Sequence, residues 1–386
     1  MKILIIRNYP SFMDVIHNTY NIQEVGLAKA LTRKGHKADI VFWTDKEEKE
    51  EKIEFDEGQY ITVFYKRGKN ILKNAWFKDI DDLISEYDVI QACEYNQIQS
   101  WYWAKKYQNK MIIYHGPYYS SFNARYNLIC KVFDMFFLKR YIKLKTKFIV
   151  KSKLAAEFLI SKGIEGENIS AIGVGIDTQL LDISDNYTSE FIEEMKNNTK
   201  DLKLLYIGKI EKRRDPNFLI DVLKSMIDRG VNVHLYVIGD GKENDTSDFQ
   251  KYINTNDIKE NITWIRKCEQ KYLANVYKSS DVFLLPTKYE IFGMVLLEAM
   301  YYGCVVYTTI NGGSSMLITN GVSGYILNTD NKEDWISKIL NIHNNKILQK
   351  NIKENATNKI KKEFTWDALA DKFINRYESI INKKQL

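Results

Sequence analysis

The sequence of 386 residues lacks the marks of a metal-binding, secreted or membrane-spanning protein. Its cysteines lie far apart, with no CxxC pair and no neighbouring His or Cys at the spacing of metal ligands: Cys93, Cys130, Cys268 and Cys304. No window approaches the roughly 20 apolar residues that span a bilayer, and the apolar stretch in the opening MKILIIRNYP is too short for a signal peptide. We therefore expect reduced core cysteines and a cytoplasmic protein.

A strong charge of one sign is also missing. The 56 Lys and Arg residues against 50 Asp and Glu give a formal net charge of +6, with acidic residues scattered throughout. This excess is too mild to predict nucleic-acid binding by itself, and it fits an anionic small substrate or a membrane surface equally well. The composition is that of a globular protein, and the length allows about two domains.

One strand-helix-strand pattern occurs in both halves. KILIIR is followed by a loop, the helical NIQEVGLAKALTRKG and the strand-like KADIVFW; from residue 202 the order returns as LKLLYIG, KIEKRRDP, NFLIDVLKSMIDRG and VNVHLYVIG. In each copy a continuous apolar strand precedes an amphipathic helix that ends at a basic residue plus glycine. Further apolar runs alternate with helical patterns, as parallel sheets require: DVIQAC, KMIIYHG, KFIVKS, NITWI, DVFLLP and CVVYTT.

The sequence therefore predicts an α/β protein with two Rossmann-like domains whose parallel sheets face each other across a cleft. We place the N-terminal domain at residues 1–185, the C-terminal domain at 186–365, and a C-terminal helix that packs back toward the N-terminal domain at 366–386. The polar stretch 182–201 is expected to carry the linker. Ligands sit beyond the carboxyl ends of parallel strands, so four loops should face the cleft: those after Arg7, Tyr114, Gly208 and Pro286.

The segment KYEIFGMVLLEAM, residues 288–300, places two glutamates eight positions apart in a run that otherwise reads as buried helix. Glu290 precedes the helix that opens at Gly293, and Glu298 lies roughly 7 Å further along its axis at about 1.5 Å per residue. A helix N-terminus offers backbone N–H groups to a phosphate, so the two carboxylates could bracket a phosphate-linked ligand. Alternatively, Glu290 is a first-turn acid that favours the helix dipole, and Glu298 is a surface residue.

Nearly the whole chain resembles the retaining glycosyltransferases of family 4, of the bacterial surface-glycan type, which have the GT-B fold and an E-x7-E motif. The resemblance rests on the order and spacing of several segments: LAKALTRKGHKADIV, IIYHG, GVGID, IGKIEKRRDP, YVIGDG, the E-x7-E run, INGGSSMLITNGVSGYIL and FTWDALADKFINRYESI. It implies retaining transfer of a hexosyl or N-acetylhexosaminyl group from a nucleotide diphosphate sugar, which we expect to be a UDP-sugar. The acceptor is expected to be a hydroxyl of a glycan or lipid-linked acceptor in surface polysaccharide synthesis, and neither a cofactor nor a metal is expected.

The resemblance also implies roles for residues of the E-x7-E run. Glu298 would accept hydrogen bonds from the ribose of the nucleotide. Glu290, with the backbone amides of Phe292, Gly293 and Met294, would hold the transferred sugar and the diphosphate.

Four further residues follow from the same resemblance: Gly208, Lys209 and Arg214 would bind the donor, and His115 would be catalytic. After Gly208, relatives usually offer an Arg next to Gly and a Lys a few residues on, whereas this chain has Lys209 and Arg214. The charge is kept, but a lysine cannot make the two-pronged contact of a guanidinium. His115 occupies the position of a family histidine that approaches the sugar and the reacting carbon. The alternative for the segment with Lys209 and Arg214 is a solvated basic loop. The alternative for His115 is a core or loop histidine whose hydrogen bonds are satisfied within the protein.

The first loop departs from the family pattern. Relatives usually carry a glycine pair there, whose backbone approaches the phosphates, whereas NYPSFMDVIHNTYN has no glycine. Either a side chain such as Asn18 or Thr19 contacts the phosphates in place of the glycines, or the loop binds the acceptor instead.

Residues 123–147 carry seven Lys or Arg against one Asp, interleaved with Phe, Leu and Ile. Such a basic amphipathic stretch can lie on an anionic membrane surface, which would place the protein peripherally on the inner face of the membrane. A helix that packs on its own sheet is the alternative.

Two other functions fit the same segments. One is a non-catalytic sugar-nucleotide-binding partner of an active glycosyltransferase, against which the retention of His115, Glu290 and Glu298 argues. The other is a GT-B epimerase or phosphorylase, which would turn over without a sugar acceptor or with inorganic phosphate. VIGDGKEN is not a dinucleotide fingerprint, because it lacks the third glycine and follows a second strand.

Overall fold

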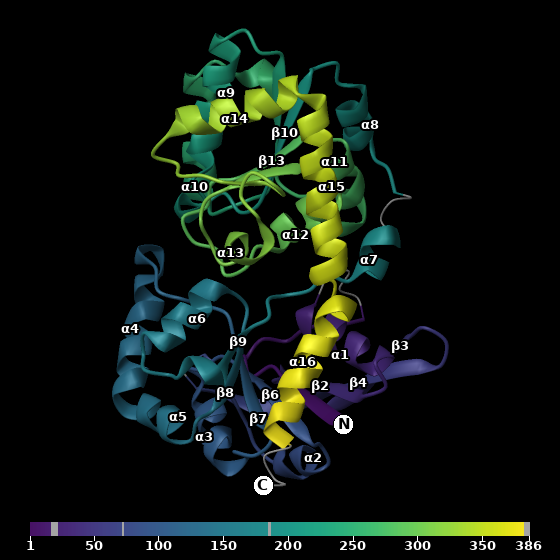
Figure 1. The fold of residues 1–386 in the computed structure, drawn as a ribbon, viewed down its shortest axis with the longest axis vertical. Coiled ribbons are helices and arrows are strands. Elements are labelled where there is room, and N and C mark those ends of the chain that lie inside the picture. The colour runs from purple at the N-terminus through teal and green to yellow at the C-terminus, as the bar shows by residue number, and fades with distance from the viewer. Residues whose placement is uncertain (17–21, 72, 184–186, 382–386) are drawn as a thin grey trace. The chain divides into compact units, whose positions relative to one another are not determined.

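The computed structural model describes residues 1–16, 22–71, 73–183 and 187–381, which form two compact units (Figure 1). Unit 1 comprises Met1–Asp177 and the segment that begins at Thr365, and unit 2 comprises Thr178–Phe364. Each unit is an α/β domain with its own sheet.

The sheet of unit 1 has the strand order β3-β4-β2-β1-β6-β7-β8-β9, with β5 paired to β4. Both β3 and β5 run antiparallel to β4, and the other neighbours are parallel. The strands are β1 (Lys2–Ile6), β2 (Lys37–Thr44), β3 (Lys49–Phe55), β4 (Gln59–Ile71), β5 (Asn74–Phe77), β6 (Val89–Cys93), β7 (Met111–His115), β8 (Lys147–Val150) and β9 (Ile169–Ala171). The apolar runs predict β1, β2, β6, β7 and β8, but they miss β3, β4, β5 and β9. For β3, KEEKIEF, the reason is that it is a charged edge strand that is largely exposed.

The α- and π-helical segments of unit 1 are α1 (Gln23–Arg33), α2 (Asp81–Ser85), α3 (Ile98–Lys106), α4 (Ala124–Phe133), the π-helical η2 (Asp134–Leu138), α5 (Lys139–Lys143), α6 (Lys153–Ile160) and α16 (Trp366–Ile381). The last of these, α16, packs on α1 of the same unit. A Cβ at Gly26 would lie 2.2 Å from the indole of Trp366, so only glycine leaves room for this contact. The hydroxyl of Tyr377 donates a 2.7 Å hydrogen bond to Gln91 of β6, which fixes the helix to the sheet core.

The sheet of unit 2 is parallel throughout, with the order β12-β11-β10-β13-β14-β15. Its strands are β10 (Leu202–Ile207), β11 (Val233–Ile238), β12 (Ile262–Ile265), β13 (Val282–Leu285), β14 (Val305–Thr308) and β15 (Tyr325–Ile326). Its helices are α7 (Thr178–Ile183), α8 (Glu190–Asn197), α9 (Pro216–Asp228), α10 (Glu243–Thr255), α11 (Leu273–Lys278), α12 (Met294–Tyr301), α13 (Ser314–Leu317), α14 (Lys332–Asn344) and α15 (Lys346–Glu363). The repeated strand-helix-strand pattern is thus confirmed at β10, α9 and β11.

The polar stretch expected to be a linker contains helix α8. Its Ile192 and Met195 are fully buried in unit 2, and the Ser189 hydroxyl accepts a hydrogen bond from the amide of Ile192. The linker prediction was wrong for this helix. Its many polar residues form one exposed face, so the two buried apolar positions are not evident from the composition of the stretch.

Candidate functional site

The loops at the carboxyl edge of the unit 2 sheet contact each other through glycines. A Cβ at Gly239 would lie 1.8 Å from the carbonyl oxygen of Gly208, and one at Gly241 would lie 2.1 Å from that of Ile210. Gly239 also has a φ of +151°, which other residues rarely adopt. These glycines therefore allow the loop after β11 to pack directly against the loop after β10.

Arg214 and Glu290, both predicted from the sequence, meet at this edge. The Nη2 atom of Arg214 lies 2.6 Å from Oε2 of Glu290, and both side chains are largely buried. Nη1 of Arg213 lies 3.9 Å from the same oxygen and donates a 2.6 Å hydrogen bond to the carbonyl of Tyr289. Arg213 was missed by the sequence reasoning, although it adjoins Arg214, and it ties the loop after β10 to the loop after β13.

The two predicted cations differ in their surroundings. Arg214 is largely buried, whereas Lys209 is exposed, and the carbonyl of Lys209 accepts a 2.8 Å hydrogen bond from the hydroxyl of Tyr206. A Cβ at Gly208 would lie 2.9 Å from that hydroxyl and 3.6 Å from Nη1 of Arg214. Gly208 therefore leaves space beside the guanidinium, while the ammonium of Lys209 is reachable from solvent.

The loop that carries Glu290 leads into α12 through Gly293, which has a φ of +81°. A Cβ at this position would lie 3.1 Å from Cγ of Glu290. Among the described residues, no side chain caps the helix and no acidic residue lies in its first turn. Glu290 precedes the helix by four residues, so it is not a first-turn acid.

A pair of glycines after β14 packs against the backbone of the loop that carries Glu290. A Cβ at Gly312 would lie 1.9 Å from the carbonyl oxygen of Ile291, and one at Gly313 would lie 1.6 Å from that of Phe292. The amide of Gly312 donates a 3.0 Å hydrogen bond to the carbonyl of Glu290. The sequence analysis did not assign these glycines to the site, although a Gly-Gly pair two residues after the predicted strand CVVYTT was the available signal.

Glu298 lies inside unit 2, and the surface alternative for it is wrong. Its side chain is 2% exposed, and Oε2 accepts a 2.8 Å hydrogen bond from the hydroxyl of Tyr277 on α11. Burial raises the pKa of the carboxyl to about 7, although hydrogen bonds from Tyr277 and Gln270 act in the opposite direction. Glu298 is therefore a carboxyl group whose protonation changes near neutral pH.

His115 ends β7 in unit 1, at the carboxyl edge of that sheet. The ring is fully buried, and its Nδ1 atom contacts the carboxylate of Glu94, which follows the neighbouring strand β6. Glu94 was not predicted, because its proximity to His115 follows from the pairing of the two strands. Asn18 and Thr19, proposed for the first loop, lie outside the described residues.

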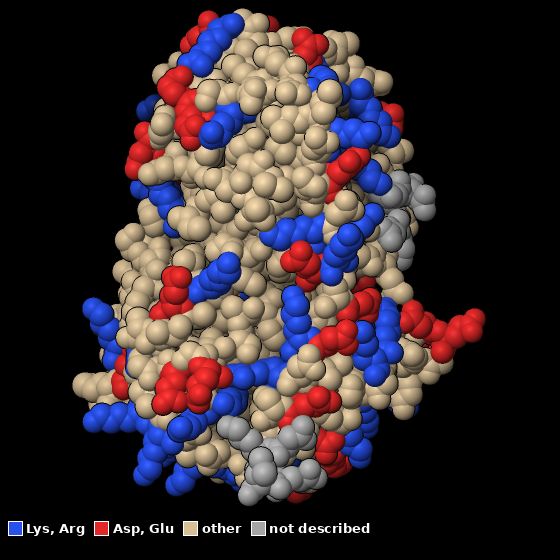
Figure 2. Space-filling view, in the orientation of Figure 1, with Lys and Arg blue, Asp and Glu red and all other residues tan. Residues whose placement is uncertain are grey.

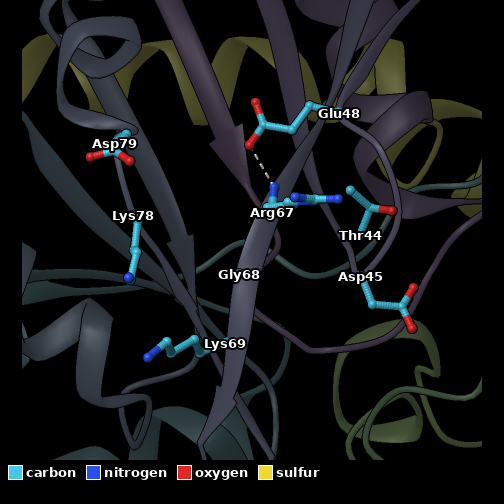
Figure 3. A pocket seen from close by; sticks show the side chains of 8 residues that line it. All are labelled: Thr44, Asp45, Glu48, Arg67, Gly68, Lys69, Lys78 and Asp79. Carbon is cyan, nitrogen blue, oxygen red and sulfur yellow. Dashed lines mark hydrogen bonds between the residues drawn. The ribbon is translucent and has the colours of Figure 1, made fainter.

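Unit 1 also has a pocket of about 410 Å³ beside β2 and β4, which contains none of the predicted site residues (Figure 3). Its lining mixes both signs of charge: Thr44, Asp45, Glu48, Arg67, Gly68, Lys69, Lys78 and Asp79. Glu48 accepts a 2.8 Å hydrogen bond from the amide of Arg67, whose Nε donates to the carbonyl of Lys46. The three acids offset the three cations, so the pocket has no clear preference for an anion.

Neither a metal cluster nor a membrane span is found within the described ranges. No group of three or more His, Cys, Asp or Glu side chains there could hold a metal ion. None of the helices in those ranges is both long and apolar enough to cross a bilayer.

Two protein families match separate parts of the chain. Residues 188–359 match the family described as glycosyl transferases group 1, and residues 25–180 match the family described as glycosyltransferase family 4. The first match lies in unit 2, and the second begins in unit 1 and ends just past its boundary with unit 2.

Two curated relatives are each similar to part of this chain. Spore coat protein SA of Bacillus subtilis (strain 168) is 24% identical over 181 residues, which are 45% of this chain and 48% of that protein. The capsular polysaccharide biosynthesis glycosyltransferase CapM of Staphylococcus aureus is 24% identical over 245 residues, 62% of this chain and 63% of that protein. The aligned region thus spans about half of the first relative and less than two thirds of the second.

The similarity to solved structures extends over nearly the whole chain. The crystal structure of HepE from Anabaena in complex with UDP superposes with a TM-score of 0.72 at 14% identity, covering 98% of this chain and 100% of that one. At this identity the likeness shows the fold, which is GT-B, and the fold alone.

Proposed function

Since this chain carries the two domains of a GT-B glycosyltransferase, we propose that it transfers a sugar from a nucleotide diphosphate sugar to a hydroxyl group of an acceptor. The observation that carries the proposal is the ion pair between Arg214 and Glu290, whose Nη2 and Oε2 atoms lie 2.6 Å apart, with Glu290 four residues before α12. A guanidinium and a helix N-terminus favour a diphosphate, and the adjacent carboxylate can accept hydrogen bonds from sugar hydroxyls.

The donor is proposed to be a UDP-sugar, in keeping with the UDP complex of HepE. Arg214, Lys209 and the amides of Phe292, Gly293 and Met294 bind the diphosphate in this proposal. Glu298 accepts hydrogen bonds from the ribose in place of the one from Tyr277. The transferred group is a hexosyl or N-acetylhexosaminyl unit held by Glu290.

We further propose that the reaction retains the anomeric configuration by a front-face route. The bond between the anomeric carbon and the phosphate oxygen breaks, and the acceptor oxygen bonds to the same face of that carbon. The acceptor proton passes to the leaving phosphate. Arg214, Lys209 and the N-terminus of α12 are oriented before the reaction, and they stabilise the negative charge that builds on the diphosphate.

The acceptor is proposed to be a surface glycan or its lipid-linked precursor. The similarity to CapM, a capsular polysaccharide biosynthesis glycosyltransferase, supports this class of acceptor.

A contact with anionic lipid belongs to the same proposal, and the surface of α4, η2 and α5 supports it. Four apolar side chains there have exposed fractions between 50% and 66%: Leu128, Val132, Met135 and Phe136. Exposed bases accompany them: Arg125, Lys131, Lys139 and Lys143. The one acid of residues 123–147, Asp134, pairs with Lys162. Figure 2 shows Lys and Arg side chains at the lower left, where Figure 1 places α4 and α5.

The helix-packing alternative holds for the opposite face of this segment. Cys130, Phe133 and Tyr141 are buried in the core of unit 1. The segment therefore packs on its own unit with one face and presents bases and apolar side chains on the other, as a lipid-binding surface requires.

Titration of UDP and of uridine by calorimetry tests the donor site. We expect Arg214→Ala to weaken UDP binding by about 10- to 100-fold, because charge-assisted bonds to phosphate are lost, while uridine binding stays unchanged. Lys209→Ala should weaken UDP binding less, since its ammonium is exposed. Arg229→Ala is the matched control, because this arginine pairs with Glu333 away from the site.

An equal loss of UDP and uridine affinity in Arg214→Ala would overturn the assignment. Transfer assays with the unmodified protein separate the alternative functions. Binding of UDP-sugars without turnover indicates a non-catalytic partner, and turnover without a sugar acceptor or with inorganic phosphate indicates an epimerase or a phosphorylase.

A further inference from the structure

Glu94 has a strained backbone and a buried carboxylate at the carboxyl edge of the unit 1 sheet. Its φ is +55°, a conformation that residues other than glycine rarely adopt, and its exposed fraction is 5%. Such backbone strain persists only where the surrounding structure holds it in place. Here the amide of Glu94 donates a 3.0 Å hydrogen bond to the carbonyl of Tyr114, which keeps Glu94 beside the end of β7.

The carboxylate of Glu94 holds two groups at once. Its Oε2 atom contacts Nδ1 of His115 and accepts a 3.2 Å hydrogen bond from the amide of Gly116. Burial pushes the pKa of this carboxyl up, but His115, Lys151 and the Gly116 amide outweigh that effect and hold it below its usual value. The group behind the imidazole is therefore an ionised carboxylate.

The other nitrogen of the imidazole has no such partner. Nε2 of His115 is buried and makes no hydrogen bond within the part of the chain that the structure describes. The ring of His115 packs between two aromatic side chains. It stacks on Phe158 with the ring centroids 5.5 Å apart, and it lies edge-on to Tyr95 with the centroids 5.2 Å apart. A buried polar atom without a hydrogen bond is unfavourable, so Nε2 is suited to receive one from a ligand.

We propose that Glu94 is a positioning residue that holds the Nδ1 proton of His115 and thereby directs Nε2 toward a hydroxyl of the substrate. The inference rests on the proposed glycosyltransferase function and on the role beside the transferred sugar that the family resemblance implies for His115. A carboxylate at Nδ1 fixes both the tautomer and the orientation of an imidazole. Because the ring is fully buried, a substrate reaches Nε2 only after the side chains that cover the ring move.

Nitrogen NMR of the histidine side chains tests the positioning without any activity assay. We expect His115, assigned by comparison with His115→Gln, to carry its proton on Nδ1 in the unmodified protein. In Glu94→Gln the new amide can donate as well as accept a hydrogen bond, so both tautomers should appear. Asp39→Asn is the matched control, because Asp39 is also a buried carboxylate of unit 1. It accepts hydrogen bonds from the amide of Thr62 and the hydroxyl of Tyr87, and none from a histidine among the described residues.

Steady-state kinetics provide the second arm. Glu94→Gln and Glu94→Ala should lower kcat by about 100-fold with UDP affinity unchanged, whereas Asp39→Asn should keep kcat near the unmodified value. The inference is overturned if His115 carries its proton on Nε2 in the unmodified protein, or if Glu94→Gln keeps full kcat. Failure of the glycosyltransferase proposal looks different, since the unmodified protein then shows no transfer while the NMR result stands.

Discussion

The carboxyl edges of the two sheets present acidic side chains to different partners. In unit 1, Glu94 faces the imidazole of His115, and in unit 2, Glu290 faces the guanidinium of Arg214. A guanidinium stays charged at every pH that a protein tolerates, whereas an imidazole can carry its proton on either nitrogen. The same α/β layout therefore supplies a fixed charge in unit 2 and an oriented proton carrier in unit 1.

The largest effect that tests this comparison is expected from Glu290→Gln. The substitution removes the carboxylate that orients sugar hydroxyls as the anomeric carbon becomes cationic, so kcat should fall by about 100-fold or more with a smaller change in KM. UDP lacks the sugar, and Arg214 loses its anionic partner, so UDP binding should stay equal or become tighter. Steady-state kinetics and UDP calorimetry measure the two effects.

Glu333→Gln is a control for the loss of a paired surface carboxylate in the same unit. If Glu290→Gln keeps full kcat, the carboxylate only stabilises the structure of the loop and takes no part in catalysis. If it abolishes UDP binding, Arg214 depends on Glu290 for its position, and the fixed-charge description of unit 2 is wrong.

The sequence predicts the parts of the molecule in which a local pattern carries the information. Continuous apolar runs identify β10, β11 and β13, because parallel strands are buried on both faces. Glu94 illustrates what a local pattern cannot show. It lies 21 positions from His115, and the two meet only because β6 pairs with β7 in the register that places Cys93 beside Tyr114.

The next prediction contrasts two carboxyl groups within unit 2. Glu290 faces a cation, whereas Glu298 is buried against Tyr277 with a pKa raised from 4.5 to about 7. Between these values the folded state binds more protons than the unfolded state, so the free energy of unfolding falls as pH rises. Glu298→Gln removes this dependence. The free energy of unfolding of the variant minus that of the unmodified protein should therefore increase by about 3 kcal/mol from pH 4.5 to pH 8.

Urea denaturation at several pH values measures the difference, with Glu290→Gln as the comparison variant. A parallel pH dependence in Glu298→Gln and the unmodified protein would show that another group is responsible. In the transfer assay, Glu298→Gln should raise KM for the donor by about tenfold and leave kcat nearly unchanged, because the ribose is bound equally in the ground and transition states.

The smallest expected effect concerns the outer surfaces of the units. Unit 1 carries exposed apolar and basic side chains together on α4, η2 and α5, whereas three exposed apolar residues of unit 2 lie on different segments: Ile310 before α13, Val322 after α13 and Ile347 on α15. Each exposed lysine near an anionic bilayer contributes about 1 kcal/mol, so Lys139→Gln should weaken vesicle binding about fivefold. Arg140 is unsuitable for this test, because its guanidinium lies 3.4 Å from the ring centroid of Trp101.

Sedimentation with vesicles of anionic and of neutral lipid measures this binding, and Lys372→Gln on α16 is the control for the loss of one exposed lysine from unit 1. Phe136→Ser should weaken binding to anionic vesicles as well, since Phe136 is 65% exposed and its ring can enter the interface. Equal losses in Lys139→Gln and Lys372→Gln would mean that only the overall charge matters. Absence of binding by the unmodified protein would refute the lipid contact and leave the two sheet edges as the remaining basis for the comparison.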